Sequence, residues 1–136
     1  MQCMTILNRV IMSNEDYLSK SLREPLKRFI LKMQKTLGFN QKHVYTTAKM
    51  SAKSYKRFFD GCELWRARDR IIIASLVILR DVKEHKKIDE DGYDELKKEW
   101  LQVGGDTAIA VEDLSQSTLR KYLIDVCQTA KKRFYS

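Results

Sequence analysis

The chain has 136 residues, 43% of them hydrophobic, and a formal net charge of +8. This length suits one compact domain or two very small ones, and the apolar content suffices for a sizeable core. One Pro and five Gly argue against collagen-like or linker-rich classes. Lys, Leu, Ala, Glu and Arg are abundant and alternating β-branched runs are scarce, so the sequence predicts a compact all-α protein of several helices.

Two further function classes are disfavoured by the sequence. The longest apolar run, Ile71–Leu79, is much shorter than a membrane-spanning helix, so we expect no membrane partner. The three Cys are odd in number and lack CxxC pairs, which predicts neither a disulfide framework nor a zinc site. Together with a start that lacks the pattern of a signal peptide, this favours a cytoplasmic protein.

The charge is unevenly distributed along the chain. Arg23 to Lys86 has 16 Lys or Arg against 6 acids, whereas Ile88 to Asp113 has 2 against 9. The tail from Leu114 has 5 against 1. A basic surface of this size attracts polyanions, although solubility alone also explains many basic proteins.

In chain order, the first expected unit is an arm or helix at residues 1–22, with Ser13 as a candidate N-cap. A capping-box pattern at Ser21–Glu24 then precedes a helix over Pro25–Leu37. Its apolar residues recur at steps of three and four, and Gly38 ends it.

Three helices are expected to follow within a domain that spans residues 23–82. Asn40 caps a short helix from Gln41 to about Lys49, and Ser51 caps a second over Ala52–Phe59. The third, from about Ala67 to Val82, is apolar on several sides and should be the most buried.

Residues 83–136 are expected to form a C-terminal helical extension. The acidic segment supplies an apolar edge of Leu96, Trp100 and Leu101, and Val103–Asp106 (VGGD) is the clearest break in the chain. Ser115 then caps a last amphipathic helix, whose expected buried face is Leu119, Tyr122, Leu123 and Val126.

The stretch Gln41–Phe59 contains five Lys or Arg and no acid. It fits either a solvated helical hairpin or a helix-turn-helix, whose second helix enters the major groove of DNA. Composition leaves these alternatives nearly even. In the second alternative, the outer face of the second helix is Ala52, Lys53, Lys56 and Arg57, cations that reach phosphates or the acceptor edge of guanine.

The same stretch resembles the helix-turn-helix of the lambda-repressor-like (Cro/CI, Xre-type) family. In that family a Gln opens the second helix, an aliphatic residue follows three later, and an apolar turn residue precedes a small N-cap. The motif closes on an apolar pair, a polar residue and Gly. The matching positions here, within a resemblance that covers residues 23–82, are Gln41, Val44, Met50, Ser51, Phe58, Phe59, Asp60 and Gly61.

Three positions depart from the family pattern. Tyr45 replaces a small Ala, Tyr55 replaces an aliphatic residue, and Lys49 replaces the Gly of the turn. We expect the two tyrosines to pack together and Lys49 to adopt a strained left-handed conformation.

The resemblance implies a sequence-specific DNA-binding transcriptional regulator of prokaryotic or phage type. Its partners would be double-stranded DNA, a second copy of the chain in a homodimer, and RNA polymerase or another regulatory protein. No metal or cofactor is expected. The implied DNA-binding residues are Gln41, Ser51, Ala52, Lys53, Lys56 and Arg57.

Two alternatives remain open at this stage. Leu114–Leu123 aligns with Met50–Phe59 and either packs as a dimerisation or core helix or forms a second DNA-binding element, with Gln116, Ser117, Arg120 and Lys121 as its contacts. The chain also fits a protein-interaction module, such as an antitoxin or adaptor, with residues 88–113 as an acidic docking segment.

No catalytic constellation is visible, and an enzyme is not expected. His43 and His85 lie in different segments without obvious partners. A faint calcium-loop pattern at residues 87–98 has Lys at its first and last ligand positions, which argues against calcium.

Overall fold

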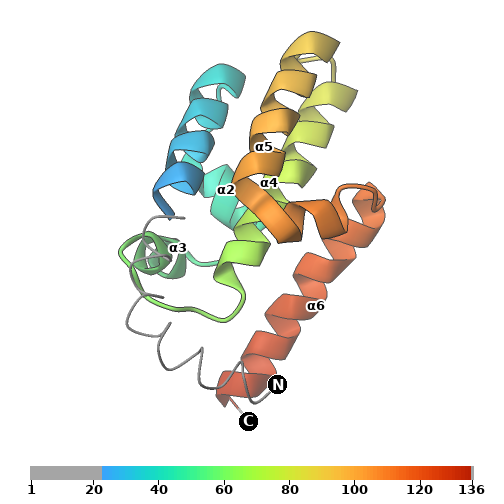
Figure 1. Ribbon diagram of the computed structural model, residues 1–136. Coiled ribbons are helices and arrows are strands. Elements are labelled where there is room, and N and C mark those ends of the chain that lie inside the picture. The colour runs from blue at the N-terminus through green and yellow to red at the C-terminus, as the bar shows by residue number, and fades with distance from the viewer. Residues whose placement is uncertain (1–22, 136) are drawn as a thin grey trace, which may run out of the picture.

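The structure is a computed structural model that describes residues 23–135, and these residues contain helices and no strand. A first helix covers residues 23–37 and is followed by α2 (Gln41–Thr47) and α3 (Ala52–Phe59). The remaining helices are α4 (Ala67–Glu84), α5 (Glu90–Val111) and α6 (Gln116–Tyr135). The predicted all-α class is therefore confirmed (Figure 1).

Helix α4 is the centre of the fold. Every residue from Ile71 to Leu79 is buried, and α4 packs against α2, α3, α5 and α6. Figure 1 shows α5 running alongside α4, and α6 extending below them toward the C-terminus. The run that is apolar on several sides is thus the most buried helix, as predicted, because neighbours cover it all round.

The expected helix caps are present. The side chain of Asn40 accepts from the His43 N–H at 3.2 Å, and that of Ser51 accepts from the Ser54 N–H at 3.1 Å. The Ser115 hydroxyl accepts from the Thr118 N–H at 3.2 Å. These bonds satisfy N–H groups that have no partner within their own helix, so short polar residues fix where three helices begin.

The expected break at Val103–Asp106 is a kink within α5. Only Gly105 leaves helical geometry, with φ 55° and ψ −131°, and the helix continues to Val111. Gly104 lies where α5 approaches α4, since a Cβ there would stand 3.0 Å from Ile72 Cγ2. One turn earlier, Trp100 donates its indole N–H to the Ile72 carbonyl at 2.8 Å. Helix α5 therefore bends at the glycine pair, while its side that faces α4 stays packed on that helix.

Helix α6 packs back onto α4. Leu119, Leu123 and Val126 are buried and Tyr122 is half-buried, which confirms the predicted inner face. Arg80 of α4 donates to the carbonyls of Glu112 at 2.6 Å and Leu114 at 2.5 Å, at the turn before α6. The C-terminal extension is thus joined to the same core as the N-terminal helices.

Some predicted features lie outside the described residues, and a further prediction concerned membrane-spanning helices. The arm at residues 1–22, the cap at Ser13 and the first half of the Ser21–Glu24 capping box lie outside the described residues. None of the helices that the structure describes combines the length and apolar character needed to cross a bilayer.

Replacing Gly104 with Ala should destabilise the protein. The added Cβ would meet Ala108 Cβ at 2.6 Å, and both atoms are fixed by backbone rather than by flexible side chains. Overpacking of this kind costs about 1–3 kcal/mol of the free energy of unfolding, measured by urea denaturation. Gln102→Ala, at an exposed site on the same helix, is the control and should change that free energy by less than about 0.5 kcal/mol. Equal stability of the two variants would mean that Gly104 is not packed as closely against Ala108 and Ile72 as the structure has it.

Candidate nucleic-acid interface

Helices α2 and α3 are joined by a tight turn. The Lys49 N–H donates to Thr46 O at 3.1 Å and the Met50 N–H donates to Tyr45 O at 2.8 Å. Lys49 has φ 59°, in the left-handed region that the resemblance predicted for this position. This conformation costs a non-glycine residue about 1–2 kcal/mol, so neighbouring contacts must hold the turn.

Arg70, the buried arginine at the start of α4, supplies such a contact. Its Nε donates to the Ala48 carbonyl at 3.2 Å, and Nη2 donates to the Lys49 carbonyl. Burial lowers the pKa of the Arg70 guanidinium from its ordinary value, although it remains a donor at any physiological pH. The positive charge of Arg70 therefore lies against two carbonyl oxygens of the turn between α2 and α3.

Helix α3 has two distinct faces. Tyr55 and Phe58 are buried against the core, whereas the predicted DNA-binding positions are exposed. Within residues 23–135, Lys53, Lys56 and Arg57 have no ion-pair partner. We call Ala52, Lys53, Lys56 and Arg57 the outer face of α3. It therefore presents three cations that no acid in the described chain neutralises.

The other two predicted residues flank this face. Gln41 is exposed at the start of α2 and lines the same surface groove as Ala52 and Lys56. Ser51 is exposed, but its hydroxyl already bonds within the cap, to the N–H and hydroxyl of Ser54. Gln41 thus has a free amide beside the outer face, and Ser51 acts first as a cap.

An aromatic cluster holds α3 against α2. The ring centroids of Tyr45 and Tyr55 are 5.8 Å apart, which confirms that the two unusual tyrosines pack together. Phe59 extends the cluster, with its ring 4.9 Å from Tyr55 and 5.0 Å from Phe58. Burial raises the pKa of the Tyr55 phenol to about 12, so it stays neutral. One tilted and two edge-to-face ring pairs thus pack at the junction of α2 and α3.

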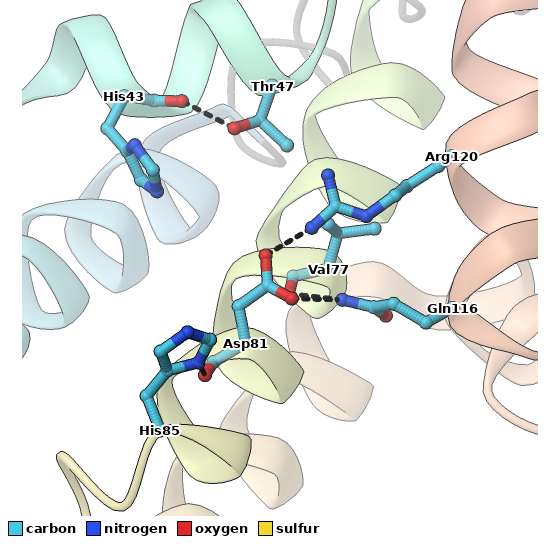
Figure 2. Close-up of polar contacts among 7 residues, drawn as sticks. All are labelled: His43, Thr47, Val77, Asp81, His85, Gln116 and Arg120. Carbon is cyan, nitrogen blue, oxygen red and sulfur yellow. Dashed lines mark hydrogen bonds and ion pairs between the residues drawn. The ribbon is translucent and has the colours of Figure 1, made fainter.

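The second candidate element lies on α6 and is occupied by contacts to α4. Gln116 Nε2 donates to the Val77 carbonyl at 2.8 Å and to Asp81 Oδ1 at 3.0 Å, and Arg120 forms an ion pair with Asp81. Figure 2 shows Asp81 between these two side chains. Ser117 and Lys121 are exposed. Gln116 and Arg120 are therefore held by α4, and the Ser117 hydroxyl lies 3.2 Å from that of Ser115.

The two histidines line a common hollow that the sequence did not reveal. His43 and His85 border a depression of about 300 Å³ together with Asp81, Lys87 and Arg120. His85 Nδ1 lies 2.8 Å from the Asp81 carbonyl oxygen (Figure 2). Among the described residues, no group of three His, Cys, Asp or Glu is arranged to hold a metal ion.

Comparisons with models of protein families, with curated proteins and with solved structures gave no match to this chain. The interpretation of the α2–α3 unit therefore depends on its own geometry and chemistry.

Replacing Arg70 with Met should loosen the turn. The Ala48 and Lys49 carbonyls would lose their donor in a buried setting, which costs about 1–3 kcal/mol of stability. Native-state hydrogen exchange should show faster exchange at the Met50 amide. Lys86→Met, at an exposed site, is the matched control and should change neither value. An unchanged Met50 amide in Arg70→Met would contradict the role given to this arginine.

Proposed function

We propose that the chain is a DNA-binding regulator that places α3 in the major groove of double-stranded DNA. The observation that carries this proposal is the outer face of α3, where Lys53, Lys56 and Arg57 are exposed and unpaired within the described chain. Cations that have no acidic partner, on a helix that packs firmly on the core, are suited to binding a polyanion such as DNA.

The arrangement assigns different tasks to the side chains. Ala52 is short and permits close approach of the helix to base edges. Arg57 and the lysines donate to the O6 and N7 acceptors of guanine or to phosphates. The amide of Gln41 binds a phosphate beside the groove, which fixes the register of α3.

The resemblance to the lambda-repressor-like family supports this proposal through its apolar positions. Val44, Met50 and Phe58, at the family's core positions, are buried, and the polar positions of the motif, Gln41, Ser51 and Asp60, are exposed. The family's behaviour suggests a homodimer, because one helix reads too few base pairs for useful specificity, and action through RNA polymerase or another regulatory protein.

The α6 element is proposed to act in packing rather than as a second DNA-binding helix. Gln116 and Arg120 are held by Asp81, and releasing them would leave that carboxylate without its cation. Glu112 and Asp113 also precede α6 and would repel phosphates.

The alternative of a protein-interaction module is favoured by one observation. Asp91, Asp94 and Glu95 are exposed along the start of α5 and have no ion-pair partner among residues 23–128, whose side chains the structure describes. They form an acidic surface on a helix other than α3. A basic partner that binds there would leave the outer face of α3 free for DNA.

Replacing Lys53, Lys56 or Arg57 with Ala should weaken binding to duplex DNA and leave thermal stability nearly unchanged. A residue that reads a base should cost about 1–3 kcal/mol, and one that binds phosphate should weaken all sequences alike. Fluorescence anisotropy with labelled duplexes measures the loss, and Lys98→Ala on α5 is the matched control. Equal loss in the control would mean that binding follows net charge and not α3.

Replacing Arg120 with Ala should separate packing from DNA contact. Loss of the ion pair with Asp81, which is partly exposed, should lower the unfolding free energy by about 0.2–1 kcal/mol. DNA affinity should stay within twofold of the wild-type value, roughly the scatter of such measurements. Lys121→Ala removes a second exposed cation of α6, and Lys98→Ala on α5 is the control for simple loss of charge. A marked fall in affinity for Arg120→Ala and Lys121→Ala, without a fall for Lys98→Ala, would instead assign α6 to the DNA.

A further inference from the structure

A groove runs between the helix at residues 23–37 and α3. It has a volume of about 420 Å³, and its apolar lining includes Ile30, Leu31, Tyr55 and Phe59. Leu31 is 55% exposed, although it is a large aliphatic side chain on a well-formed helix. Ile30 and Tyr55 belong to the buried core, so the apolar surface that the groove exposes is that of Leu31 and the half-buried Phe59.

The two sides, or banks, of the groove are the helix at residues 23–37 and α3, and the lining residues on each recur at steps of three and four. Lys27, Leu31 and Gln34 lie at steps of four and three along the first bank. Ala52, Lys56 and Phe59 repeat the same steps along the second. Seven residues of helix extend about 10 Å, so each bank is two turns long. A third helix laid between them would meet anchors at the spacing typical of helix-in-groove binding.

The charged residues that line the groove favour an occupant that carries acidic side chains. Lys27 and Lys56 face it from opposite banks, and neither has an ion-pair partner among residues 23–135. Gln34 and Gln41 add uncharged amides, and Asp60 at the end of α3 is the one acid among the described residues of the lining. An apolar strip between two unpaired lysines complements a helix whose apolar stripe is bordered by acids.

We propose that this groove is a docking site for an amphipathic helix of a partner protein, with aliphatic anchors flanked by Asp or Glu. The anchors pack on Leu31 and Phe59, and the acids pair with Lys27 and Lys56. Because Gln41, Ala52 and Lys56 belong both to this lining and to the proposed DNA contacts, the partner and DNA exclude each other. This last point rests on the proposed function, whereas docking itself does not.

The probe for the test is a synthetic 16-residue helix with leucines every three to four positions and glutamates beside them. A matched peptide carries lysines in place of the glutamates. Amide shifts of the isotopically labelled full chain, recorded by NMR without DNA, should change around Ile30, Leu31 and Tyr55 with the acidic peptide alone. Leu31→Ala should weaken this binding about fivefold to tenfold, the loss expected for removing part of an apolar anchor. Lys27→Glu should weaken it further at low salt.

Matched controls are available on the same chain. Leu114→Ala removes another exposed leucine, 40% exposed and outside the groove, and Lys98→Glu reverses an exposed charge on α5. Neither should change peptide binding. Shifts that miss the groove, or equal binding of the lysine peptide, would overturn the proposal. So would self-association of the chain that Leu31→Ala abolishes, since the groove would then hold a second copy.

A separate titration tests the link to DNA. The acidic peptide should displace labelled duplex from the wild-type chain, and Leu31→Ala should bind duplex normally but resist displacement. If the peptide binds in the groove while no duplex binds at all, the proposed DNA function fails and the docking site stands. If duplex binds and the peptide does not, the docking site fails and the DNA function stands.

Discussion

The fold depends on the complete burial of the middle of α4. Nine consecutive residues, Ile71–Leu79, are buried, so this helix has no face that water can reach there. Such a helix is stable in water only when neighbours enclose it, and α2, α3, α5 and α6 all pack on it. The positions of these four helices, and therefore of the outer face of α3, follow from covering α4.

The start of α4 connects this core to the proposed DNA-binding unit. Arg70 is the last polar residue before the buried run, and its guanidinium closes the turn between α2 and α3. The turn contains Lys49 in a left-handed conformation that glycine would adopt without strain. A buried arginine thus offsets a costly backbone conformation, and the orientation of α3 relative to α2 is set by the core rather than by local propensity.

Most of the fold could be predicted from the sequence, because its signals are local. Apolar spacing and the caps at Asn40, Ser51 and Ser115 defined the helix starts, and the burial of Leu119, Leu123 and Val126 on α6 followed from their spacing. The glycines at Val103–Asp106 predicted a break where the structure has a kink, since the packing of Trp100 and Gly104 on α4 continues the helix.

Contacts between distant segments were not predictable in the same way. Nothing local indicates that Arg70 reaches the Lys49 carbonyl, that Asp81 holds Gln116 and Arg120, or that His43 and His85 border one hollow. These depend on how helices pack on α4, which periodicity does not specify. Exposure of the α3 cations was predictable, whereas their lack of acidic partners required the packed structure.

The central claim is that the unpaired cations of α3 bind DNA phosphates and base edges. The salt dependence of affinity for duplex DNA tests it most directly, because each phosphate neutralised releases counterions. We predict that log affinity falls linearly with log salt, with a slope of about −0.9 for each phosphate contacted. If Lys53→Ala, Lys56→Ala or Arg57→Ala removes a phosphate contact, that variant should reduce the steepness of the slope by about one. A flat salt dependence, or a slope that none of these substitutions changes, would contradict the account.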